Sequence, residues 1–139
     1  MGDNIASYAD NCSITLNGLY YGYESDRKIK NLYSSKVQEE WAFELSPSFN
    51  PHISILIHEF AHVIDSLIAL SQSQAVIVDY NYYVKEMRHK KEKSYAGVNI
   101  YEYVAQNITE AITAKHKSEK AKQLLKYAAS LFHQNLQRG

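Results

Sequence analysis

Residues 50–71, which read NPHISILIHEFAHVIDSLIALS, decide the fold of this chain. Apolar residues cover nearly the whole circumference of a helix drawn through them, as expected of a buried helix. One polar stripe survives, because His58, His62 and Asp65 stand at positions i, i+4 and i+7 of a single face. The most apolar part of the stretch, residues 53–70, nearly reaches membrane-spanning length, but these three residues and Glu59 interrupt it, so it is interpreted as a core helix.

The polar stripe has the residue types of a zinc site. Two imidazoles one helical turn apart can each offer a neutral nitrogen to one metal ion, at about 2.0–2.1 Å. Glu59 lies about 100° to one side of His58, where its carboxylate can take a proton from a water that the metal activates. Residues 58–62 thus match the His-Glu-x-x-His pattern. The alternative is two core histidines that hydrogen-bond to backbone carbonyls and bind no metal. This would bury two imidazoles and two carboxylates in one stripe, at a considerable cost in free energy.

A catalytic zinc keeps three protein ligands and one open position, so the pattern requires a third ligand from elsewhere in the chain. Cys12 is the only cysteine, which excludes sites built from several thiolates and leaves His and carboxylate donors. The candidates are Asp79, His89, Glu102, Glu110 and His116. Glu102 falls in the most informative segment, whereas Asp79, His89 and His116 also suit exposed positions near helix ends or charged faces.

The rest of the chain divides into a strand-rich part and a helical part. Residues 13–21, 28–33 and 39–45 carry β-branched and aromatic residues between turn formers, with a turn expected at 22–27. After residue 50 the apolar spacing becomes helical, which predicts helices at about residues 50–71, 74–91, 99–116 and 118–136. The expected fold class is α+β, with a small N-terminal antiparallel sheet followed by about four helices.

Length and charge limit the domain count and the partners. With 139 residues the chain can bury one core but is short for two domains, so we expect a single domain over 1–139. Lys+Arg and Asp+Glu number 15 each, and this balance favours neither nucleic acid nor an anionic membrane as a partner. The N-terminus has no signal-peptide pattern, so a cytoplasmic location is expected for the chain as given.

A second segment carries a resemblance to a known family. Ser94-Tyr95 is followed by Asn99-x-x-Glu102, and the tyrosine stands seven residues before the glutamate, since 102 − 95 = 7. Together with residues 58–65, HEFAHVID, this segment resembles the catalytic core of the anthrax lethal factor-like zinc metallopeptidases. The clostridial Pro-Pro endopeptidases are similar in the same places. The resemblance spans about residues 50–115.

The resemblance implies a minimal zincin-like catalytic domain of the gluzincin type, with one Zn²⁺ per chain, that hydrolyses a peptide bond of a protein substrate. It implies that His58, His62 and Glu102 are the zinc ligands, that Glu59 is the base, and that Tyr95 stabilises the oxyanion or assists the leaving group. Residues 39–45 would be the edge strand that pairs with an extended substrate. By analogy the protein would be phage-encoded, or a toxin module delivered into a target cell.

Three further residues are expected to support the site, and each has a second interpretation. Asn99 and Glu102 also fit a helix-start capping box, in which Asn caps the helix and Glu reaches back to its amide. Asp65 either orients a ligand histidine or pairs with a nearby lysine. Gln106 stands where many relatives carry a second glutamate, so a charge near the ligands is lost. Tyr95 is one of 12 tyrosines, and could serve only packing.

Two other functions stay open at this point. One is a regulatory metallopeptidase that cleaves a phage repressor, although that class lacks the Ser-Tyr and Asn-x-x-Glu pairing. The other is a catalytically inactive module that keeps the peptidase fold and binds zinc or a partner protein. In either enzyme interpretation we expect a monomer whose partner is a protein or peptide substrate.

Overall fold

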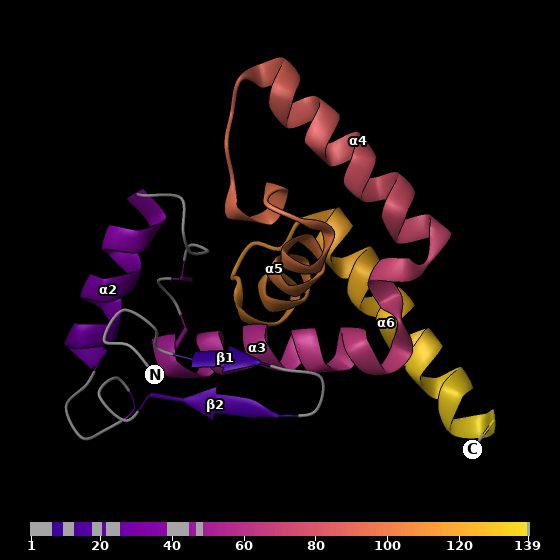
Figure 1. Ribbon diagram of the computed structural model, residues 1–139, viewed down its shortest axis with the longest axis horizontal. Coiled ribbons are helices and arrows are strands. Elements are labelled where there is room, and N and C mark those ends of the chain that lie inside the picture. The colour runs from indigo at the N-terminus through magenta and orange to yellow at the C-terminus, as the bar shows by residue number, and fades with distance from the viewer. Residues whose placement is uncertain are drawn as a thin grey trace.

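The computed structural model of the chain describes residues 7–9, 13–17, 21, 26–38, 45–46 and 49–138, and this part is mostly helical (Figure 1). The α-helices in it are α2 (Asp26–Gln38), α3 (Pro51–Ile68), α4 (Gln74–Lys90), α5 (Ile100–Thr113) and α6 (Glu119–Arg138). Two short 3-10 helices, η1 (Leu70–Gln72) and η2 (Tyr95–Gly97), lie between them. Strands β1 (Ser7–Ala9) and β2 (Ile14–Leu16) pair antiparallel, with Ser7 opposite Leu16.

The four helices predicted after residue 50 are confirmed, with ends within three residues of the expected ones. Helix α3 begins where the Asn50 side chain accepts a hydrogen bond from the Ile53 amide at 3.1 Å and Pro51 occupies the first turn. It ends at Ala69, whose left-handed backbone (φ 52°) stops the helix. None of the helices in the described ranges combines the length and apolar character needed to cross a bilayer.

The predicted N-terminal antiparallel sheet is confirmed only as one short strand pair, and one of its predicted strands is wrong. Residues 28–33 belong to helix α2. Of the strand expected at 13–21, Ile14–Leu16 forms a strand and residue 21 is helical, while residues 18–20 lie outside the described residues. In the described part of the chain the only strand pairing is the short one between β1 and β2. The predicted strand at 39–45 lies outside the described residues except for Leu45, so its role as a substrate-binding edge stays a prediction.

Helix α2 forms because a single stripe of it is buried. Ile29 and Tyr33, one turn apart, pack against Ile55 of α3, with Tyr21, Leu32, Leu45 and Tyr95 around them. Lys28, Lys30 and Asn31 face outward and are exposed. The run therefore has the helical spacing of three and four, and packing against α3 favours the helix over the strand that its side-chain types suggested.

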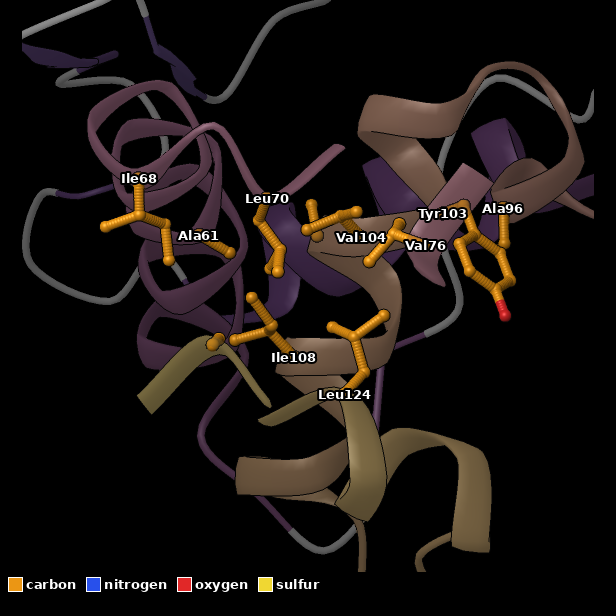
Figure 2. Close-up of a cluster of buried hydrophobic side chains, with 11 residues drawn as sticks. Ala61, Ile68, Leu70, Val76, Ala96, Tyr103, Val104, Ile108 and Leu124 are labelled. Carbon is orange, nitrogen blue, oxygen red and sulfur yellow. The ribbon is translucent and has the colours of Figure 1, made fainter. Parts of the chain in front are cut away.

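The main core fastens α5 to its neighbours. Figure 1 shows α5 crossing α3, with α6 behind it and α4 reaching away from the far end of α3. The buried residues of this core come from α3 to α6 and the segments between them, as drawn in Figure 2: Ala61, Ile68, Leu70, Val76, Ala96, Tyr103, Val104, Ala105, Ile108, Leu124 and Ala128. Leu124 and Ala128 are the contribution of α6, and Leu125 and Leu131 pack against the same cluster. This core sets the position of α5 against α3.

Candidate metal centre

His58, His62 and Glu102 meet between α3 and α5. The Nε2 atom of His58 lies 3.0 Å from Oε2 of Glu102, and the Nε2 atom of His62 lies 3.5 Å from Oε1 of the same carboxylate. The two imidazole rings stand nearly perpendicular, 82° apart, with centroids 5.0 Å from each other. Their side chains are 4% and 21% exposed and that of Glu102 is 16% exposed, so the group is shielded but open on one side.

The donor set and the spacing of its atoms could hold a metal ion. One ligand atom from each residue can be chosen so that all three lie within 4.8 Å of one another. Bonds of about 2.0–2.1 Å in a tetrahedral arrangement put neighbouring ligand atoms about 3.3 Å apart. The two Nε2 atoms lie 3.0 and 3.5 Å from different oxygens of the Glu102 carboxylate, which are distances of the same order. Three donors of types that zinc prefers would leave one position for water or substrate.

Glu102 reaches the histidines because of how α5 begins. Asn99 has an extended backbone, and its side chain accepts a hydrogen bond from the Glu102 amide at 2.9 Å. The first part of the capping-box interpretation, in which Asn99 caps the helix, is therefore confirmed. The Glu102 carboxylate, however, is directed across to α3, where it faces His58 and His62. The cap thus fixes the backbone from which this carboxylate extends.

The pairing shifts the protonation of both sides. Burial alone would raise the pKa of Glu102, but hydrogen bonds from His58 and His62 outweigh it and lower that pKa to about 2. Burial alone would lower the pKa of His62, but its hydrogen bond to Glu102 and the charges of Glu102, Glu59 and Asp65 raise it instead. The negative charge of these three carboxylates favours a cation at the site.

The proposed base and hydroxyl lie beside these residues. Glu59 is buried on α3 next to His58, and its charge acts on His62, Tyr95 and Tyr33. The Tyr95 ring lies 6.3 Å from the His58 ring between centroids. Burial raises the pKa of Tyr95, and the charge of Glu102 and a hydrogen bond to it add to the effect. The Tyr95 hydroxyl therefore stays protonated and able to donate at neutral pH.

Tyr33 is a neighbour of the site that the sequence did not reveal. It is buried on α2, and burial raises its pKa, followed by the charge of Glu59. The residue falls in the segment expected to be a strand, where no pattern links it to residue 59. Its spacing of four from Ile29 was the available signal, because it places both side chains on one helical face.

The supporting residues take different positions. Asp65 is buried and accepts a hydrogen bond from the Ser71 amide at 2.7 Å, which holds the turn after α3, while its charge also acts on His62. Gln106 follows Glu102 by one turn, and no donor in the described part of the chain reaches its buried Oε1 atom. Both remain predicted, rather than demonstrated, influences on metal binding.

The other candidate ligands lie elsewhere. Asp79 pairs with Lys120 at 2.8 Å, and Glu110 accepts a hydrogen bond from the Ser118 amide at 2.7 Å. His89 and His116 are exposed. In the described ranges, the one group of three or more His, Cys, Asp or Glu residues suited to a metal ion is His58, His62 and Glu102. Glu102 is therefore the candidate that the fold brings to the two histidines.

Comparison with known proteins adds no relative: no family model, no curated protein and no solved structure matches the chain. The chain is a helical protein in which a His-Glu-x-x-His helix turn and a distant glutamate form a possible metal site.

Proposed function

We propose that the protein is a zinc-dependent endopeptidase with a minimal zincin-like fold, acting as a monomer on a protein or peptide substrate. The observation that carries the proposal is the convergence of His58, His62 and Glu102 within 4.8 Å, from two helices that are 40 residues apart at their nearest ligands, since 102 − 62 = 40. The resemblance of residues 58–65 and 94–102 to the lethal factor-like peptidases supports the same reaction.

The roles of the residues follow from their chemistry. A zinc ion, when bound by His58, His62 and Glu102, would polarise the scissile carbonyl and lower the pKa of water toward about 7. The Glu59 carboxylate accepts the proton of the attacking water and passes it to the leaving amine. The Tyr95 hydroxyl donates a hydrogen bond to the oxygen on which negative charge develops. The closeness of its ring to that of His58, 6.3 Å between centroids, supports this role.

Metal analysis is the first test. We expect about one zinc per chain in the wild-type protein and none in His58→Ala. His116→Ala is the matched control, because His116 is exposed and lies outside the group, so this variant should keep its zinc. A wild-type protein that binds no zinc in chelator-free buffer would refute the proposal.

Cleavage is the second test. A peptide library made from a digested proteome is incubated with zinc-loaded wild type or with Glu59→Gln, and new termini are counted by mass spectrometry. Loss of the base should lower the cleavage rate about 10²–10⁴-fold while zinc binding persists. Equal cleavage by both proteins would exclude Glu59 as the base. Zinc binding without Glu59-dependent cleavage would favour a binding module without turnover.

A further inference from the structure

Two tyrosines of α4 hold the turn that carries Tyr95. The Tyr83 hydroxyl donates a hydrogen bond to the Ser94 hydroxyl oxygen at 2.8 Å. The Tyr80 hydroxyl donates to the Gly97 carbonyl oxygen at 3.2 Å. These two contacts fall on either side of Tyr95, one just before η2 and one at its end. They connect the turn to a helix that contributes no residue to the candidate metal centre.

The contact through Ser94 reaches the backbone of the turn. The Ser94 hydroxyl oxygen also accepts a hydrogen bond from the Ala96 amide at 3.2 Å, which makes Ser94 the cap of η2. The Ser94 hydroxyl oxygen thus accepts hydrogen bonds from both the Tyr83 hydroxyl and a backbone amide. The α4 side chain is therefore coupled to the backbone conformation at Tyr95 through a single polar atom.

Two residues of the turn pack against apolar groups: Ala96 lies in the main core, and Tyr95 packs against the buried cluster around Ile55. Residues 91–93 and 98–99 on either side of it are exposed, and Ala96 is the one residue of η2 that is fully buried. Its local hydrogen bonds, from the Gly97 amide to Ser94 O and from the Val98 amide to Tyr95 O, fix its shape but not its place in the molecule. Because its flanks are exposed, the hydrogen bonds from Tyr83 and Tyr80 are what hold the two ends of the turn in place.

The same tyrosines contact the helix that carries Glu102. The ring of Tyr103 lies 5.5 Å from that of Tyr80 and 5.2 Å from that of Tyr83, in tilted and edge-on arrangements that favour attraction. Tyr103 is almost fully buried and directly follows Glu102. Tyr80, Tyr83 and Tyr103, which we name the tyrosine cluster, thus link the turn of Tyr95 to the start of α5.

We infer that Tyr80 and Tyr83 are positioning residues that keep the Tyr95 hydroxyl in register with Glu102 and the two histidines. The role in turnover rests on the proposed function, whereas the positioning itself does not. Since a displacement of about 1 Å at a reacting group can cost about 100-fold in rate, loss of one hydroxyl far from the centre should lower turnover. Substrate and zinc affinity should change little, because neither residue is placed to touch them.

Phenylalanine variants separate positioning from packing, because they keep the ring and remove only the hydroxyl. Tyr83→Phe is compared with Tyr82→Phe, a matched control whose side chain is 62% exposed. The first readout is the ¹⁹F spectrum of 3-fluorotyrosine placed at position 95. We expect its resonance to shift, broaden or split in Tyr83→Phe and to stay unchanged in Tyr82→Phe. An unchanged spectrum in Tyr83→Phe would overturn the inference, whether or not the protein cleaves peptides.

The second readout is cleavage of a quenched fluorescent peptide library, with zinc content measured in parallel. Tyr83→Phe should lower kcat about 10-fold or more at unchanged KM and zinc content. In a Tyr95→Phe background the same change should have no further effect, since the hydroxyl it positions is gone. Ser94→Ala should match Tyr83→Phe, and their double variant should be no worse. Additive losses in these pairs would contradict coupling through Tyr95.

Discussion

The pairing of Glu102 with two histidines predicts that stability depends on pH in opposite directions without and with zinc. Without zinc, the Glu102 pKa of about 2 in place of 4.5 means stabilisation that is present above pH 4.5 and lost as the pH falls toward 2. The raised pKa of His62 means stabilisation that is present below pH 6.5 and lost as the pH rises through the raised value. Both contributions are complete only between pH 4.5 and 6.5.

The Glu102→Gln substitution isolates this contribution, because the amide has similar size and no charge. At 1.36 kcal/mol per pKa unit, the fall from 4.5 to about 2 corresponds to about 3 kcal/mol. For a domain of this length that is roughly 10 °C in Tm at pH 5.5. The deficit should shrink as the pH rises through the raised pKa of His62, where that imidazole loses its charge. Zinc binds neutral imidazoles, so its stabilisation of the wild type should grow over the same range.

Scanning calorimetry from pH 4 to 9, in EDTA and in zinc, measures both slopes. Zinc at 100 times its Kd should add about 2.7 kcal/mol above pH 7.5 in the wild type and much less in Glu102→Gln. Glu92→Gln is the control, because Glu92 is exposed and lies outside the metal group. If Glu102→Gln matches this control in EDTA at pH 5.5, the ion pair does not stabilise the fold and the reasoning fails.

Three further substitutions have defined outcomes. Gly97→Ala should leave Tm within about 2 °C, since an added Cβ would meet only Tyr83 Cε1 at 3.9 Å and the Gly97 φ is not positive. Tyr103→Phe should keep the free energy of unfolding in urea or raise it by up to about 1 kcal/mol. The hydroxyl that it removes is buried and has no hydrogen-bond partner in the described part of the chain. Burial, followed by the charge of Asp79, raises the pKa of this hydroxyl to about 12. Asn99→Ala should lower the free energy of unfolding by about 1 kcal/mol and weaken zinc binding in calorimetric titration, because it removes the cap. Asn99→Asp keeps the cap and should bind zinc like the wild type. Equal zinc affinity in the wild type and both variants would show that the cap does not position the Glu102 ligand.

The helices after residue 50 could be predicted because their signals are local. Asn50 and Asn99 cap helices that begin within one residue of the predicted starts, and apolar spacing of three and four persists between them. Helix α2 could not be predicted in the same way, since Ile29, Leu32 and Tyr33 are residue types that also suit a strand. What decides the conformation there is the contact of Ile29 and Tyr33 with Ile55, a residue more than 20 positions away in the chain.

The residues of the candidate site also differ in whether local sequence signals predicted their proximity. His58 and His62 share a helix turn, so their proximity follows from the sequence alone. Glu102 is brought to them by packing of α5 on α3, and only a resemblance to known peptidases indicated it beforehand. The tyrosine cluster had no sequence signal beyond the spacing of Tyr80 and Tyr83, because a hydroxyl that binds a turn 11 residues away leaves no periodic pattern.

Small residues explain how a carboxylate on one helix reaches two imidazoles on another. Ala61 lies between His58 and His62 along α3, and Ala105 follows Glu102 by three residues on α5; both are fully buried in the main core. An alanine at a helix crossing lets the two backbones approach closely, whereas a larger side chain there would push them apart. We expect a larger side chain at either alanine to lengthen the distances of 3.0 and 3.5 Å between the Glu102 carboxylate and the two histidines. The same packing of α5 on α3 thus forms part of the main core and brings the candidate metal ligands together.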